Sequence, residues 1–215
     1  MADIRHYSLI DQLCLGIDQA LRSVFNHPNT SGRAYPAEDV PMLPQENASQ
    51  QRSASIMRIN HAGEICAQAL YHGQGLVSRS QKIQDKMQQA AIEEGDHLAW
   101  CHQRLMELGS HTSYLAPIWY AGSFAIGLMA GLMGDPWSLG FLAETEHQVV
   151  KHLEKQMHLL PEDDRRSHLI LQQMQQDEKQ HRDEAVRAGA LSLPQSIKQA
   201  MQWVSGIMVK TTYWV

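Results

Sequence analysis

The sequence is poor in the residues that mark several classes of protein. Its 215 residues include three cysteines, Cys14, Cys66 and Cys101. They are too few and too scattered for a disulfide framework or a thiolate metal cluster, and they fit a reducing compartment. Basic residues do not predominate, because 18 Lys and Arg stand against 23 Asp and Glu, which gives a net charge of −5 at pH 7. Nucleic-acid binding, which needs a basic surface, is therefore not expected.

Long uninterrupted apolar runs are also scarce. Charged residues break up the apolar positions of the first 21 residues, so we expect neither a secretory signal nor a mitochondrial presequence there. Only the segment 110–134 is long and free of Asp, Glu, Lys and Arg, and its mostly apolar part, 115–133, has the minimum length of a membrane span. Because that part contains a proline and several glycines, we expect a membrane-interfacial helix near 112–134, with burial inside the protein as the alternative.

Proline and helical periodicity divide the chain. Four of its eight prolines lie between residues 28 and 44, which predicts a linker, and strand-like alternation is rare elsewhere. We therefore predict an all-α protein with two parts: residues 1–47 form an N-terminal helix and a Pro-rich linker, and residues 48–215 form a helical bundle domain. The predicted helices cover 8–25, 48–78, 81–109, 114–160 with a break near Pro136, 163–189 and 194–212.

Glutamates lie on helix faces that should be apolar. Glu94 is the clearest case, and His97 lies only about 60° from it on a helical wheel, whereas the neighbouring Glu93 lies off this face. The same pattern surrounds Glu146 and Glu178, and a weaker one surrounds Glu64. The apolar residues within about 40° of Glu94 are Ile83, Met87, Ala90, Leu98, Cys101, Leu105 and Leu108.

Each of the four long helices thus directs one glutamate towards the core, and two of these glutamates have a histidine three residues later. A buried, unpaired carboxylate loses several kcal/mol or more of solvation, and four together would repel one another, so a pair of metal cations is the most direct compensation. One Glu from two helices and Glu-x-x-His from two others is the ligand pattern of ferritin-like di-iron and di-manganese bundles. The predicted ligands are Glu64, Glu94, His97, Glu146, Glu178 and His181.

Other interpretations apply to single residues. A third Glu-x-x-His pair, Glu144 and His147, lies on the opposite helix face, and we expect it on the surface. A single buried glutamate could pair with Arg58 or Arg182 instead of a metal. Four glutamates in the same register favour the metal site.

The predicted ligands also suggest the chemistry. Four carboxylates and two imidazoles form a hard donor set that suits iron or manganese, without deciding between them. Six side chains around two ions leave coordination positions free for dioxygen. The second nitrogen of a metal-binding histidine usually contacts another acceptor, and Asp96 and Asp177, next to predicted ligands, are candidates.

At these residues the sequence resembles the demethoxyubiquinol hydroxylases, the carboxylate-bridged di-iron enzymes of ubiquinone biosynthesis. The resemblance extends over about residues 53–189. It is carried by Met57-Arg58-Ile59-Asn60-His61-Ala62-Gly63-Glu64, Glu94-Gly95-Asp96-His97-Leu98, Thr145-Glu146-His147-Gln148 and Asp177-Glu178-Lys179-Gln180-His181.

The resemblance implies two iron ions held by the six predicted ligands, which would then form the catalytic site. It implies a monooxygenase that uses O2 to hydroxylate the ring of a polyprenylated 2-methoxy-6-polyprenyl-3-methyl benzoquinol, with the second oxygen atom leaving as water. It also implies a peripheral protein on the cytoplasmic side of the cell membrane, with other ubiquinone-biosynthesis proteins as possible partners. The alternatives are a ferritin-like protein that oxidises or stores iron and a non-enzymatic membrane-bound bundle.

Overall fold

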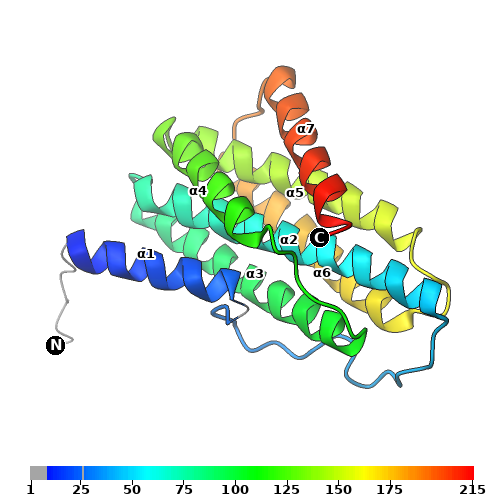
Figure 1. The fold of residues 1–215 in the computed structure, drawn as a ribbon. Coiled ribbons are helices and arrows are strands. Elements are labelled where there is room, and N and C mark those ends of the chain that lie inside the picture. The colour runs from blue at the N-terminus through cyan, green and yellow to red at the C-terminus, as the bar shows by residue number, and fades with distance from the viewer. Residues whose placement is uncertain (1–8, 26) are drawn as a thin grey trace.

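The structure, a computed structural model, describes residues 9–25 and 27–215, and these form seven α-helices and no strand (Figure 1). The all-α prediction is confirmed, and the predicted helices match the observed ones to within a few residues. Residues 1–8, the start of the predicted N-terminal segment, lie outside the described part of the chain. The helices are α1 (Leu9–Val24), α2 (Asn47–Val77), α3 (Gln81–Glu107), α4 (Ala116–Leu132), α5 (Asp135–Met157), α6 (Arg165–Arg187) and α7 (Gln195–Thr212).

Local sequence explains where these helices begin and end. Gly134 separates α4 from α5 with φ of 103°, a conformation that residues with a Cβ atom rarely adopt, and Pro136 occupies the first turn of α5. The carboxylate of Asp164 caps α6 by accepting a hydrogen bond from the backbone N–H of Ser167. The break predicted near Pro136 is therefore confirmed.

Helices α2, α3, α5 and α6 form the four-helix bundle (Figure 1). Its core has two apolar clusters with a contribution from every bundle helix. One contains Met57, Cys101, Leu153 and Met174. The other contains Tyr71, Met87, Leu142 and Ala185. On each helix the predicted glutamate ligand falls between these two levels, so the four carboxylates occupy the middle layer of the bundle.

Helix α4, the apolar segment of the sequence, packs closely along α2 (Figure 1). A Cβ atom at Gly127 would lie 2.3 Å from the carbonyl oxygen of Leu70, and one at Gly73 would lie 2.4 Å from that of Phe124. The glycines therefore let the two backbones approach. No helix of the described residues combines the length and the apolar character that a bilayer-spanning helix needs.

The predicted linker lies against the bundle. Tyr35 and Ala37 are buried in the core cluster that contains Met57. Arg33 lies over the ring of Trp100, with 4.7 Å between the guanidinium carbon and the ring centroid. The segment has no regular helix, as its prolines predict, but it forms part of the wall around the core.

Candidate metal centre

The six predicted ligands come together in the middle layer of the bundle. Each is at most 7% exposed. Their ligand atoms form two groups, and within each group the atoms lie within 4.8 Å of one another. Glu94 and Glu178 belong to both groups. The first group adds Glu64 and His97, and the second adds Glu146 and His181.

Both histidines direct Nδ1 towards the carboxylates. His97 Nδ1 lies 3.1 Å from Glu94 Oε2, 3.1 Å from Glu178 Oε1 and 3.5 Å from Glu64 Oε2. His181 Nδ1 lies 3.1 Å from Glu178 Oε2 and 3.5 Å from Glu94 Oε1. The glutamate and histidine of each Glu-x-x-His motif therefore meet on one helix face, as their spacing predicts.

The outer nitrogen of each histidine contacts a carboxylate from the opposite motif. His97 Nε2, on α3, lies 2.9 Å from Asp177 Oδ2 on α6. His181 Nε2, on α6, lies 2.5 Å from Glu93 Oε2 on α3. The two acidic residues each directly precede a predicted ligand, so the arrangement is nearly symmetric. Such contacts fix the orientation of a metal-binding imidazole and raise its basicity.

Of the two acidic residues considered as histidine partners from the sequence, only Asp177 has that role here. Asp96 instead accepts hydrogen bonds from the backbone N–H groups of Ser31 and Gly32, at 3.0 and 3.3 Å, and so holds the linker. Glu93 was missed because it lies off the apolar face of α3. Its place directly before Glu94, like that of Asp177 before Glu178, was the available signal.

The pKa values of the predicted ligands are shifted because several carboxylates lie close together where little water reaches. Burial and the charge of Glu94 raise the pKa of Glu64 well above its usual value, and burial and the charge of Glu178 do the same to Glu146. Burial alone would lower the pKa of His97, but the charge of Glu178 and the contact with Asp177 outweigh it, so that pKa is raised. Protons and metal cations therefore compete for the same atoms.

The residues present fit a metal cluster. Glu94 Oε1 and Glu146 Oε1 are buried carboxylate oxygens that accept no hydrogen bond. A buried acceptor without a hydrogen bond is costly, and more so when it is charged, and for Glu94 Oε1 the nearest compensating group is His181 Nδ1 at 3.5 Å. Two such oxygens, with two inward-facing imidazole nitrogens, form the donor set of a carboxylate–histidine site. The buried Glu and His clusters therefore indicate a metal site.

The alternative salt bridges are not formed within the described residues. Arg58 donates to the carbonyl oxygens of His111 and Tyr213 and to the hydroxyl of Ser110, and Arg182 pairs with Asp183. Neither arginine contacts one of the four inward glutamates.

The prediction that Glu144 lies on the surface is wrong. Glu144 is only 7% exposed, and its carboxylate lies 2.9 Å from Lys198 Nζ on α7. Helix α7 covers a face of α5 that the helical wheel assigned to solvent. Glu144 is absent from both carboxylate–histidine groups, as expected.

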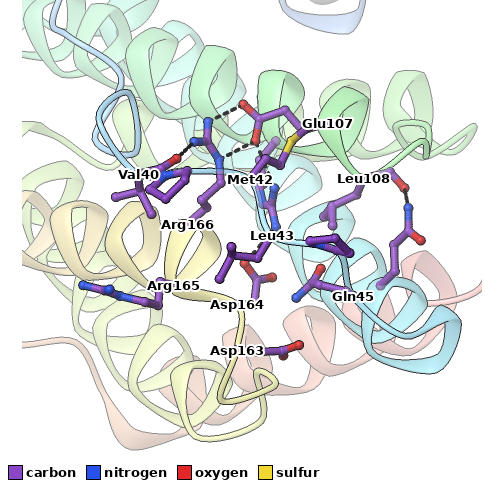
Figure 2. Close-up of a pocket in the computed structure, with 14 residues that line it drawn as sticks. Val40, Met42, Leu43, Gln45, Glu107, Leu108, Asp163, Asp164, Arg165 and Arg166 are labelled. Carbon is purple, nitrogen blue, oxygen red and sulfur yellow. Dashed lines mark hydrogen bonds and ion pairs between the residues drawn. The ribbon is translucent and has the colours of Figure 1, made fainter.

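A separate pocket of about 390 Å³ lies where the linker passes α3 and the start of α6 (Figure 2). None of the six predicted ligands lines it. Its charged side chains largely pair with one another: Glu107 accepts from Arg104 and Arg166, and Arg104 also binds Asp164. These ion pairs join α3 to the start of α6.

The fold and the site together define the class of protein: it is a ferritin-like four-helix bundle with a buried carboxylate–histidine metal site. Within that class, the chain belongs to the family described as "Ubiquinone biosynthesis protein COQ7", which matches residues 51–212.

Curated relatives are similar over nearly the whole chain. A 3-demethoxyubiquinol 3-hydroxylase of Nitrosococcus oceani is 49% identical over 98% of this chain and 99% of its own length. The protein of the same name from Acinetobacter baumannii is 51% identical over 99% of this chain and its own full length. One from Nitrosomonas eutropha is 48% identical over 96% of this chain and 99% of its own length.

Proposed function

We propose that this chain is a di-iron monooxygenase that hydroxylates demethoxyubiquinol, a polyprenylated 2-methoxy-6-polyprenyl-3-methyl benzoquinol, in ubiquinone biosynthesis. The observation that carries the proposal is the pair of overlapping carboxylate–histidine groups in the middle layer of the bundle. The names of relatives of matching length, and membership of the family, supply the substrate class. Residues 48–215 form the proposed hydroxylase domain, and residues 1–47 are its N-terminal appendage.

The six predicted ligands would hold the two irons. Glu94 and Glu178 belong to both groups, while Glu64 with His97 would complete the donor set of one group and Glu146 with His181 that of the other. The four carboxylates offset cationic charge that the surrounding apolar clusters cannot solvate. Asp177 and Glu93 orient the two imidazoles through their outer nitrogens.

When bound, the di-iron pair would supply the two electrons that, with two protons, let one oxygen atom of O2 enter a ring C–H bond while the other leaves as water, and an external reductant would restore those two electrons. The chain itself seals the site. The two apolar clusters above and below the carboxylates exclude water, which protects reactive species from side reactions.

A quinol with a polyprenyl tail resides in the bilayer, so the protein must reach the membrane surface. Helix α4 and the C-terminal helix expose large apolar side chains that suit a peripheral, interfacial contact on the cytoplasmic side of the cell membrane. These include Ile118, Met129, Leu132 and Met133 on or next to α4, and Trp203 and Trp214 on or next to α7.

The test combines metal analysis with turnover. Protein loaded anaerobically with ferrous iron, supplied with a chemical reductant and a short-tailed demethoxyubiquinol, is exposed to 18O2, and product mass is measured. We expect about two irons per chain and one 18O atom in the product. Two irons without product would contradict the hydroxylase and favour iron oxidation or storage, and no bound iron would contradict the metal centre.

Two single-residue variants test which side chains hold the iron. Glu178→Ala should abolish both iron binding and hydroxylation, because Glu178 belongs to both ligand groups. Glu154→Ala, on the exposed side of α5, is the matched control and should retain both. Equal losses in the two variants would contradict the assignment of the ligands.

A further inference from the structure

Two histidines lie beside the carboxylate cluster without belonging to it. His61, one helical turn before Glu64 on α2, is fully buried, and neither of its ring nitrogens has a hydrogen-bond partner. A buried N–H group without an acceptor costs about 1–3 kcal/mol. Its ring neighbour is His102 on α3, which is partly exposed. The two ring nitrogens of His61 are therefore available to bind a metal. His61 lies between the carboxylate cluster and the imidazole of His102, which solvent can reach.

The two rings are spaced as ligands of one ion would be. Their centroids are 6.2 Å apart, and the ring planes are inclined by 52°. A cation held at about 2.1 Å by one nitrogen of each imidazole keeps the centroids roughly 5–6.5 Å apart. The observed spacing lies within this range, so one nitrogen of each ring can reach a shared cation once the two side chains rotate towards it.

Burial favours the neutral form of both imidazoles, which is the form that binds metal. Burial, followed by the nearby His102, lowers the pKa of His61 to about 3. Burial, followed by the nearby His27, lowers the pKa of His102. Neutral imidazole is the metal-binding form, so neither residue needs to release a proton at neutral pH. His27, exposed at the start of the linker, is near enough to His102 to affect its pKa.

We propose that His61 and His102 form an uptake site at which a divalent transition-metal ion first binds on its way to the carboxylate cluster. The proposal rests on the metal centre proposed above. The six ligands of that centre are at most 7% exposed and His61 is fully buried, so a hydrated ion meets the partly exposed His102 first and His61 second. Glu64 lies three residues beyond His61 on the same helix, about 4.5 Å along its axis. Two imidazoles bind borderline cations such as Fe²⁺ and Co²⁺, which the oxygen-rich cluster then takes over.

Metal loading tests the proposal without relying on turnover. Metal-free full-length protein is mixed with Co²⁺ in a stopped-flow spectrometer, and the rate and final extent of binding are read from the visible absorption of the ion. We expect His102→Ala to load about tenfold more slowly than wild type, because one ligand of the first encounter is lost. Its final metal content should be unchanged, because the six ligands of the cluster are intact. His168→Ala, at an exposed position of α6, is the matched control and should load at the wild-type rate.

A second variant addresses the buried member of the pair. His61→Phe keeps an aromatic ring but removes both unpartnered nitrogens, so it should slow loading without lowering the midpoint of thermal unfolding of the metal-free protein. A lowered midpoint would instead mean that His61 has a structural role, and would overturn the proposal.

Other outcomes separate this proposal from the proposed function. Wild-type loading rates in His102→Ala would overturn the uptake site and leave the hydroxylase intact. A lower final metal content in His102→Ala would make that residue a support of the cluster, which also overturns the uptake site. A wild-type protein that loads normally but makes no hydroxylated product would contradict the proposed function alone.

Discussion

At the scale of single residues, each histidine of the metal centre is held from two sides. Nδ1 faces the glutamates, and Nε2 contacts a carboxylate from the opposite Glu-x-x-His helix. Asp177 is itself held by Arg33 of the linker and by Gln173 at 3.0 Å. A chain of polar contacts therefore runs from the linker, through Asp177, to His97.

Asp177 gives the first prediction. Asp177→Asn removes the charge that orients His97, and we expect iron affinity to fall about 10- to 100-fold. The measurement is iron retention against a series of chelator concentrations. Asp183→Asn, at an exposed carboxylate of the same helix, should retain iron like the wild type. Wild-type retention in Asp177→Asn would show that this contact does not support the centre.

At the scale of helices, glycine determines how α4 meets α2. Gly73 and Gly127 bring the two backbones close together, and a Cβ atom at Gly131 would lie 2.5 Å from Val77 Cγ2. From the sequence alone, these glycines predict an interfacial helix in place of a membrane span. Their physical role is to let a highly apolar helix pack against a bundle helix while its other side remains exposed.

Gly127→Ala tests this packing. The new methyl group would meet the backbone of Leu70, and such overpacking should lower the free energy of unfolding by about 1–3 kcal/mol. Gly122→Ala on the same helix is the control: no atom lies within 4 Å of its added Cβ, so alanine should stabilise by about 0.5–1 kcal/mol. Urea denaturation measures both. Equal changes in the two variants would contradict the close approach.

Glu107 links α3 to α6 and to the linker (Figure 2). Burial raises the pKa of Glu107, but hydrogen bonds from Arg166 and Arg104 outweigh it, so the pKa is lowered. A lowered pKa means that the stabilising contribution is complete above the unfolded-state pKa of about 4.3 and is lost as the pH falls through the folded-state value.

Glu107→Gln should therefore lower the free energy of unfolding by about 2 kcal/mol at pH 7. The difference from wild type should shrink as the pH is lowered from about 5 to about 3, because the wild-type carboxylate then becomes protonated. Urea denaturation across this range measures the effect. Glu162→Gln, at an exposed position, should match the wild type throughout. A difference that does not depend on pH would rule out a contribution from the charge of Glu107.

At the scale of the whole molecule, the bundle is surrounded by elements that do not carry ligands. Helices α1, α4 and α7 and the linker all contact it (Figure 1). Helices α4 and α7 leave large apolar side chains exposed, which is unusual for a surface that meets only water. We propose that these side chains contact the headgroup region of the membrane that holds the substrate.

Vesicle flotation tests this contact. Replacing Met129 and Leu132 together by serine should weaken binding to phosphatidylcholine–phosphatidylglycerol vesicles about tenfold or more, because two exposed apolar side chains are lost. Leu159→Ser, at an exposed position after α5, is the control and should float like the wild type. Unchanged flotation of the double variant would contradict an interfacial role for α4.

The sequence by itself determined the helices and the six residues that meet in the middle layer. Both follow from the helical period, which decides which residues of one helix share a face. Only the tertiary structure decided the contacts between helices: Glu93 beside His181, Glu144 paired with Lys198, and the linker bound to Asp96 and Asp177. These pairs join residues far apart in the chain. Helical periodicity could not predict them, because it describes the faces of one helix and does not tell which neighbouring element covers each face.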